Sequence, residues 1–142
     1  MIDSTLIVRK INLISQDFTD IVELSRKRLQ EFLASRVDGA LAERYLERMI
    51  GRMIDINYHL ITESGFPPPT DYYQSFLQLE RLGILSHDLA QRIAACAGLR
   101  NRIVQEYDEI DPAKIHEALQ TATRDVPQYL ARVHAHIDGL PR

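Results

Sequence analysis

Residues 40–63 read ALAERYLERMIGRMIDINYHLITE, and apolar side chains recur in this stretch every three or four positions. That spacing places them along one face of an α-helix, which turns once in about 3.6 residues. The helix should end at Ser64-Gly65, because glycine readily adopts the left-handed backbone of a helix C-terminus. A helix of this length is the central element of the fold that we predict. Its expected buried stripe consists of Leu41, Tyr45, Met49, Met53, Ile56 and Leu60.

The helical spacing continues toward the N-terminus. Apolar residues from Ile7 to Ile21 predict a first helix, and Asp3 or Ser4 can cap it by accepting a hydrogen bond from a free N–H group of the first turn. A second, short helix is predicted over residues 28–34. We interpret Asp38-Gly39 as a break between this short helix and the long one.

Toward the C-terminus, the three prolines of residues 65–70 predict a stiff loop, because proline lacks an N–H donor and restricts the residue before it. Thr70 and Ser86 are the expected caps of the next two helices. A kink or a split of the last helix is expected at Pro127. The predicted helices cover residues 71–81, 87–106 and 112–137.

Two glycines fall inside predicted helices, where each costs roughly 1 kcal/mol relative to alanine. We interpret Gly51 and Gly98 as points at which two helices approach each other closely. Together the patterns predict an all-α protein, an up-and-down bundle of about five helices. This bundle is expected to form a single domain over residues 1–142.

The composition is that of an ordinary soluble protein, with 45% hydrophobic and 26% charged residues. No apolar run approaches the roughly 18 residues of a membrane span, and the first residues lack the pattern of a signal peptide. Cys96 is the only cysteine, which excludes an internal disulfide, and we interpret it as a small buried residue. A net charge of −3 argues against a protein that coats nucleic acid but leaves room for a local basic site. We therefore expect a cytoplasmic protein with no membrane partner and with no metal or cofactor.

Residues 100–107 read RNRIVQEY, which places an arginine, an amide and a phenol within two helical turns. This segment resembles the active-site motif of the HepT-like branch of the HEPN superfamily, a group of small all-helical ribonuclease toxins. The motif of that family is an arginine, usually an asparagine, three residues, a histidine, any residue and a tyrosine. Gln105 stands where the family has its histidine, whereas Arg100, Asn101 and Tyr107 match the motif.

Further segments resemble the family in the same order along the chain, so that the resemblance covers residues 40–111. Because several motifs follow one another correctly, the resemblance is specific. The matching segments are DINYHLI at residues 55–61, the PxxYYxxF pattern at residues 69–76, residues 79–85 with their GIL, and GLRN at residues 98–101.

The resemblance implies a metal-independent RNA endonuclease, the toxin of a type VII HepT/MntA toxin–antitoxin system. In the family, a two-fold dimer sets the motifs of two chains side by side in one cleft. An MntA-type nucleotidyltransferase silences the toxin by attaching AMP to the motif tyrosine, which is Tyr107 here, and the added phosphates should repel RNA. An ordinary half-buried tyrosine is the alternative for Tyr107. The expected partners are a second copy of the chain, an MntA-type antitoxin, and RNA, with tRNA as a candidate.

RNA cleavage without a metal needs a base for the 2′-hydroxyl proton, an acid for the leaving oxygen and a cation for the phosphorane. Arg100 fits the third role, because its planar and permanently charged fork donates two hydrogen bonds at once. Histidine suits proton transfer, whereas the amide of Gln105 does not titrate and only orients a water or donates a hydrogen bond. Gln105 is compatible with a natural variant and with an inactivating substitution. The candidate catalytic residues are Arg100, Asn101 and Gln105.

The motif residues do not converge on one ideal helix. At 100° per residue, Arg100 and Tyr107 share a face, whereas position 105 lies about 140° round from Arg100. A two-fold dimer would place two Arg100 side chains near one phosphate, which is why we expect a homodimer.

The histidines of the chain offer no obvious substitute for the missing one. His116 is separated from the motif by Pro112, and His59 is expected to have a structural role. None of the histidines has the spacing of a metal site. Those expected at the surface are His87, His134 and His136.

Arg44, Arg48 and Arg52 recur every four residues along the long predicted helix. Glutamates neighbour them, so the stripe has two interpretations: a solvated face with salt bridges, or a track for phosphates or for an acidic partner. These three arginines and Arg102 are the candidate RNA-binding residues.

Two further functions are compatible with the sequence. A degenerate HEPN dimer would bind a nucleotidyltransferase, a nucleotide or RNA without cleaving it. A helical scaffold would use the motif for packing alone. RNA cleavage that depends on Arg100 distinguishes the toxin from both alternatives.

Overall fold

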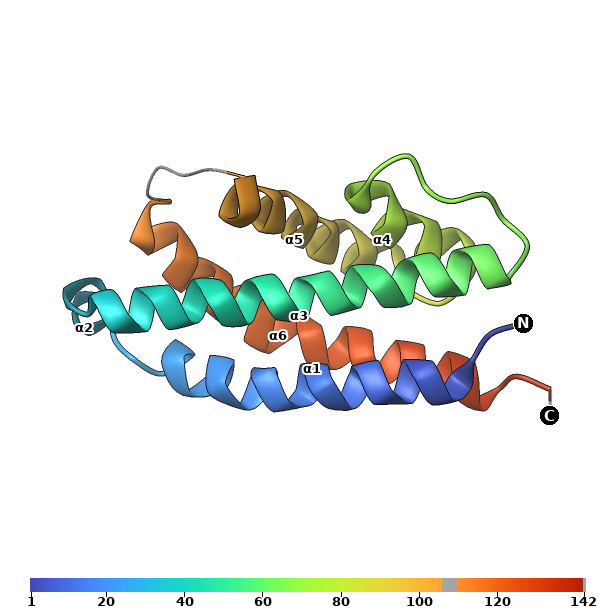
Figure 1. Ribbon diagram of the computed structural model, residues 1–142, viewed down its shortest axis with the longest axis horizontal. Helices are drawn as coiled ribbons and strands as arrows, with labels where there is room; N and C mark the ends of the chain where they lie inside the picture. The colour runs from blue at the N-terminus through green and yellow to red at the C-terminus, as the bar shows by residue number, and fades with distance from the viewer. Residues whose placement is uncertain (106–109, 142) are drawn as a thin grey trace.

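A long central helix organises the computed structural model, which describes residues 1–105 and 110–141. This helix, α3 (Arg36–Glu63), runs through the middle of the molecule (Figure 1). On one side of it, α1 (Ser4–Ser25) packs against both α3 and α6 (Pro112–Asp138). The first and the last helix of the chain are therefore neighbours in the bundle.

The other side of α3 is covered by α4 (Tyr72–Arg81) and α5 (His87–Gln105), which also pack against each other. A short helix, α2 (Leu29–Ala34), closes one end of the bundle against α3 and α6. The described residues form six helices and no strand, which confirms the predicted all-α bundle and adds a helix to the expected five or so. The predicted last residue of α5, Glu106, lies outside the described residues.

The start of α3 corrects the predicted break at Asp38-Gly39. The helix already begins at Arg36, because the hydroxyl of Ser35 accepts a hydrogen bond from the backbone N–H of Asp38 and satisfies a free donor of the first turn. Gly39 then continues the helix, with its N–H bonded to the carbonyl of Ser35. The predicted break is therefore wrong, because a capping residue precedes it.

The other helix ends follow the sequence closely. Asp3 caps α1, Ser86 accepts a bond from the first turn of α5, and Gly65 ends α3 with a φ of +92°. The cap of α4 is Asp71 instead of the predicted Thr70, because the Asp71 carboxylate accepts a hydrogen bond from the N–H of the third helical residue. Gly65 and Asp71 thus define where the loop between α3 and α4 begins and ends, and Asp71 fixes the first turn of α4.

The buried face of α3 is close to the predicted stripe, and four of its predicted members are fully buried: Met49, Met53, Ile56 and Leu60. Leu41 is 41% exposed, so this part of the prediction is wrong. The stripe begins one residue later, at Ala42, which is buried. Pro127 does not split the last helix, because α6 continues through it as one element with Pro127 on its exposed side.

Gly51 and Gly98 do not mark close approaches between helices, and that prediction is wrong. A Cβ atom built on either glycine would meet no heavy atom of a neighbouring element within 4 Å. Each glycine in a helix interior costs roughly 1 kcal/mol relative to alanine. Packing between helices does not require glycine at these positions.

The described helices include none that is both long and apolar enough to cross a membrane.

Candidate functional site

Arg100 of α5 lies over the aromatic ring of Tyr72, the first residue of α4. The central carbon of its guanidinium is 5.2 Å from the centroid of the ring, a cation–π distance. The Nε atom of Arg100 is buried and has no hydrogen-bond acceptor among the described residues. No carboxylate of the described residues forms a salt bridge with Arg100. Within the described part of the chain, the Arg100 guanidinium can therefore accept an anionic ligand.

A recess of about 340 Å³ opens beside Arg100, between α3, α4 and α5. Two tyrosines form an aromatic wall, because the rings of Tyr58 and Tyr72 meet nearly edge to face, 6.0 Å apart at 81°. Burial, followed by the charges of Tyr72 and Asp71, raises the pKa of Tyr58, so this phenol is neutral at physiological pH. The recess is lined by Gly51, Ile54, Asp55, Tyr58, Tyr72 and Arg100.

A buried hydrogen-bond network fixes the first turn of α4. The amide of Asn57 donates to the hydroxyl of Ser75 at 3.0 Å, and this hydroxyl donates to the backbone carbonyl of Tyr72 at 2.6 Å. From the other side, the single hydroxyl proton of Tyr129 is shared between the side-chain oxygen of Asn57 at 2.5 Å and the carbonyl of Met53 at 3.1 Å. The network joins α3, α4 and α6 and thereby holds Tyr72 under Arg100.

The motif residues separate along α5, as the helical geometry predicts. Asn101 is half-buried, whereas Gln105 is exposed in the last turn of α5. Tyr107, the predicted site of AMP attachment, lies outside the described residues. Within the described part of the chain, Arg100 is the only motif residue that lines the recess.

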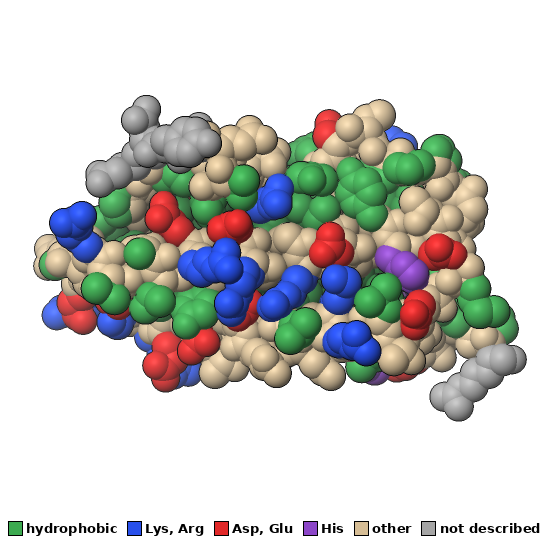
Figure 2. Space-filling view, viewed as in Figure 1, with side chains coloured by type: hydrophobic (Ala, Val, Ile, Leu, Met, Phe, Trp, Pro, Cys, Tyr) green, Lys and Arg blue, Asp and Glu red, His purple; other side chains and the backbone are tan. Residues whose placement is uncertain are grey.

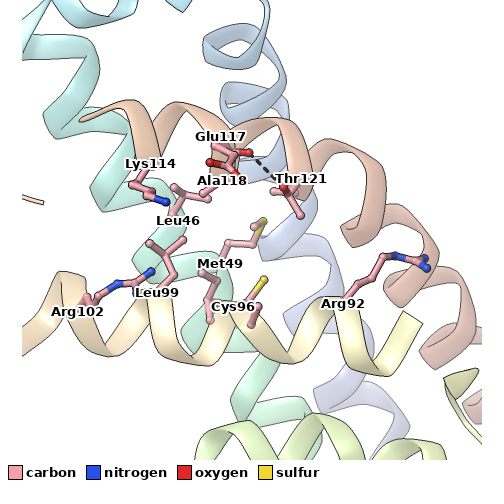
Figure 3. Close-up of a pocket in the computed structure, with 13 residues that line it drawn as sticks. Leu46, Met49, Arg92, Cys96, Leu99, Arg102, Lys114, Glu117, Ala118 and Thr121 are labelled. Carbon is pink, nitrogen blue, oxygen red and sulfur yellow. Dashed lines mark hydrogen bonds between the residues drawn. The ribbon is translucent and has the colours of Figure 1, made fainter. Parts of the chain in front are cut away.

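Arg102 lines a different cavity, of about 230 Å³, between α3, α5 and α6. Figure 3 shows Arg102 and Lys114 facing each other across one end of it, with Cys96 and Met49 deeper inside. Burial raises the pKa of the Cys96 thiol to about 12, so this thiol is protonated and a poor nucleophile at neutral pH. The structure thus assigns Arg100 and Arg102 to different surfaces of the same helix.

The histidines occupy structural or surface positions away from the recess. His59 accepts a hydrogen bond from the backbone N–H of Asp3 at 2.9 Å, which fits the structural role predicted for it. The ring nitrogen of His116 lies 2.8 Å from the carbonyl of Lys27. The remaining three, His87, His134 and His136, do not line the recess either. No histidine stands in for the one that the motif lacks.

The basic stripe on α3 has its own acidic partner. Figure 2 shows basic side chains gathered over the middle of α3, with acidic ones among them. Asp17 of α1, whose side chain is only 5% exposed, receives a hydrogen bond from Arg52 at 2.9 Å and two from Arg48, one of them at 3.2 Å. The hydrogen bond and then the charge of Asp17 raise the pKa of Arg48. Arg44 is exposed and forms a salt bridge of 3.7 Å with Glu47.

These contacts favour the salt-bridged interpretation of the stripe. RNA binding by Arg44, Arg48 and Arg52 stays a prediction, and RNA would have to compete with Asp17 for two of them. The signal for Asp17 was present in the sequence, since it falls between Ile14 and Ile21 on the apolar face of the first helix. A carboxylate at such a position needs a cationic partner.

Replacing Asp17 by alanine is expected to lower the free energy of unfolding by about 2 kcal/mol. The change removes the hydrogen bonds between α1 and α3 and leaves two arginines facing each other, although partial exposure of these arginines screens their charges. Urea denaturation measures the loss. Glu23→Ala, which removes an exposed carboxylate from the same helix, should leave stability unchanged. Equal denaturation midpoints for both variants would show that Asp17 does not hold α1 in place.

Comparison with known proteins identifies the family and the fold of the chain. The chain is 29% identical over 136 residues to the tRNA nuclease HepT of Aphanizomenon flos-aquae. The matched residues make up 96% of this chain and 92% of that protein. The tri-AMPylated HEPN toxin of Shewanella oneidensis, solved in complex with its MNT antitoxin, has a TM-score of 0.82 at 22% identity, over 92% of this chain and 97% of the toxin. YutE of Bacillus subtilis, a cytosolic protein of unknown function, has a TM-score of 0.83 at 12% identity, over 96% and 92% of the two chains.

At these low identities, the two solved structures share the fold of this chain. The model of the family described as ribonuclease HepT-like matches residues 14–133, which include α5 and the recess. The resemblance that the motif implied is thereby confirmed. The chain belongs to the ribonuclease HepT-like family.

Proposed function

We propose that this chain is a cytoplasmic toxin that cleaves RNA without a metal ion, with tRNA as the first candidate substrate, and that a nucleotidyltransferase antitoxin restrains it. The observation that carries the proposal is the position of Arg100, which lines a recess on the surface of a HepT-like fold and forms no salt bridge within residues 1–105 and 110–141. The tRNA nuclease activity named for the Aphanizomenon relative supports the choice of substrate.

Arg100 binds the scissile phosphate in this proposal. Its guanidinium stabilises the negative charge that develops on the phosphorane when the 2′-oxygen attacks. Gln105 takes no proton, because an amide does not titrate, but it donates a hydrogen bond or orients a water. With Gln105, the chain would therefore bind the phosphate but lack the proton-transfer group of the motif, which predicts slow cleavage.

The active form is a two-fold dimer in this proposal. In one chain, Arg100 lies at the recess between α3, α4 and α5, whereas Gln105 lies on the exposed last turn of α5. Two copies related by a two-fold axis bring both α5 helices to one cleft, so that residues of both chains reach the same phosphate. Val104, which is 43% exposed on that last turn, offers apolar surface for such a contact.

The antitoxin acts on Tyr107 in this proposal. The Shewanella oneidensis toxin was solved in a tri-AMPylated form with its MNT antitoxin, which supports the same kind of partner for this chain. Phosphates attached two residues beyond position 105 would add negative charge to an anion-binding cleft and exclude RNA.

Cleavage of tRNA in the presence of a chelator tests the proposal. Arg100→Ala is expected to lower the cleavage rate about 10²-fold, the usual cost of removing one donor from a developing anion. The assay is run with Gln105 and with the Gln105→His substitution, so that a slow parent does not hide the effect. Arg132→Ala, which removes an exposed arginine of α6, should cleave like its parent.

Equal rates for Arg100→Ala and its parent would show that this arginine does not act in cleavage. No cleavage in either background would favour the alternative of a degenerate dimer that only binds its partners, for which Gln105 is the supporting observation.

A further inference from the structure

The floor of the recess is formed by a helical glycine that packing does not require. A Cβ atom on Gly51 would meet no heavy atom of another element within 4 Å, and Gly51 itself lines the recess. The space that a side chain would fill at this position is therefore open to a ligand. A glycine in the middle of a helix lowers the stability of the folded protein. Ligand binding in the space beside Gly51 would explain why a glycine is kept there.

The walls of the recess suit a nucleobase. Tyr72 is 36% exposed and Tyr58 is half-buried, so parts of both rings border the space. Proteins that recognise unpaired nucleotides stack bases against aromatic side chains and arginine planes. On the remaining side, Asp55 forms a salt bridge of 3.3 Å with Lys10, whereas Arg100 has no carboxylate partner among the residues that the structure describes.

The guanidinium of Arg100 lies directly beside the aromatic wall formed by Tyr58 and Tyr72. Because Arg100 lies over Tyr72, an anion bound to Arg100 is held within reach of the space between Tyr72 and Gly51. A nucleotide consists of a flat base and a phosphate joined through a sugar. Its base would contact the aromatic wall while its phosphate binds the Arg100 cation. The volume of about 340 Å³ falls within the usual range of small-ligand sites.

We propose that this recess is a subsite for one unpaired nucleotide of the RNA substrate, with its phosphate at Arg100 and its base against Tyr58 and Tyr72 over Gly51. The inference rests on the proposed function and makes it more specific. It names the substrate class as RNA that is single-stranded next to the scissile phosphate, because a base held in a helical stack cannot enter the recess.

A side chain at position 51 tests the subsite directly. Gly51→Leu fills the floor, while Gly39→Leu is the matched control, because Gly39 lies in the same helix, also faces open space and does not line the recess. The probe is a single-stranded RNA oligonucleotide made uncleavable by 2′-O-methyl groups and carrying 2-aminopurine, whose fluorescence falls when the base stacks. Gly51→Leu is expected to weaken binding about tenfold and to abolish the quenching, whereas Gly39→Leu binds like the parent.

Tyr72 supplies a second, independent readout. Tyr72→Phe keeps the ring and should keep both affinity and quenching, whereas Tyr72→Leu should lose about tenfold in affinity. Thermal unfolding and sedimentation of each variant report whether fold and assembly are kept. If Gly51→Leu changes the assembly, the two Tyr72 variants test the subsite in its place. Equal affinity of Tyr72→Phe and Tyr72→Leu for the RNA probe would overturn the subsite.

The outcomes separate this inference from the proposed function. If Gly51→Leu binds the probe like the parent while cleavage still depends on Arg100, the subsite is wrong and the ribonuclease stands. If Gly51→Leu loses the probe while neither parent background cleaves RNA, the recess binds an unpaired nucleotide but the ribonuclease is wrong. Equal affinity for the single strand and for its duplex would also overturn the subsite.

Discussion

Replacing Gln105 by histidine is expected to raise the rate of RNA cleavage by about 10²–10⁴-fold, the usual contribution of a general acid or base. The side chain lies on the exposed last turn of α5, so an imidazole replaces the amide without disturbing the core. Arg100, the residue that we propose binds the phosphate, is the same in both proteins. The gain should therefore appear in kcat, with KM nearly constant.

The pH dependence of that variant provides a sharper test than its rate. An imidazole that transfers protons gives a rate that changes near its pKa of about 6.5, whereas an amide at the same position gives no such titration. Gln105→Asn serves as the control, because it keeps an amide and should stay as slow as the parent. A gain in rate with a flat pH profile would mean that histidine acts through shape or charge instead of proton transfer.

Replacing Asn57 by alanine is expected to lower the free energy of unfolding by about 3 kcal/mol, because two buried hydrogen bonds are lost and a cavity is left. Asn57 is fully buried and links the hydroxyls of Tyr129 and Ser75. Asn12→Ala, which removes an exposed asparagine of α1, should have little effect on stability. Chemical denaturation with fluorescence detection measures both variants.

A double-mutant cycle shows whether the network is responsible. Tyr129→Phe removes only the hydroxyl, and its effect combined with Asn57→Ala should fall short of the sum by about 1 kcal/mol. Additive effects would mean that the two residues stabilise the protein separately. In that case the network would not be what holds Tyr72 beneath Arg100.

Much of the fold could be predicted because the helices carry clear apolar periodicity and side-chain caps. The break expected at Asp38-Gly39 fails because the hydroxyl of Ser35, three residues earlier, had already started the helix. Local sequence rules treat glycine as a helix breaker, yet near an N-terminus a capping bond outweighs its modest cost.

The candidate site was only partly accessible from sequence. Arg100 stands in a motif of eight residues, whereas its contact with Tyr72 depends on how α4 packs against α5. The same limit applies to the partners of Arg48 and Arg52 on α3. From the sequence, the neighbouring glutamates of the same helix were the expected partners. Arg48 and Arg52 are instead held by Asp17, more than thirty residues away in sequence. Tertiary packing decides such pairings, and periodicity reports only which face of a helix is apolar.

The central helix α3 serves a different neighbour on each of its sides. Its arginines hold α1, Asn57 connects it to α4 and α6, and Gly51 forms the floor of the recess. Inserting or deleting one residue would rotate everything beyond that point by about 100° and disconnect these contacts together. Substitutions at exposed positions of α3 are tolerable in evolution, but changes in its length are not. Insertions and deletions among homologues should therefore occur mainly in residues 64–71. This segment follows α3, and a change in its length does not alter the helical register of α3.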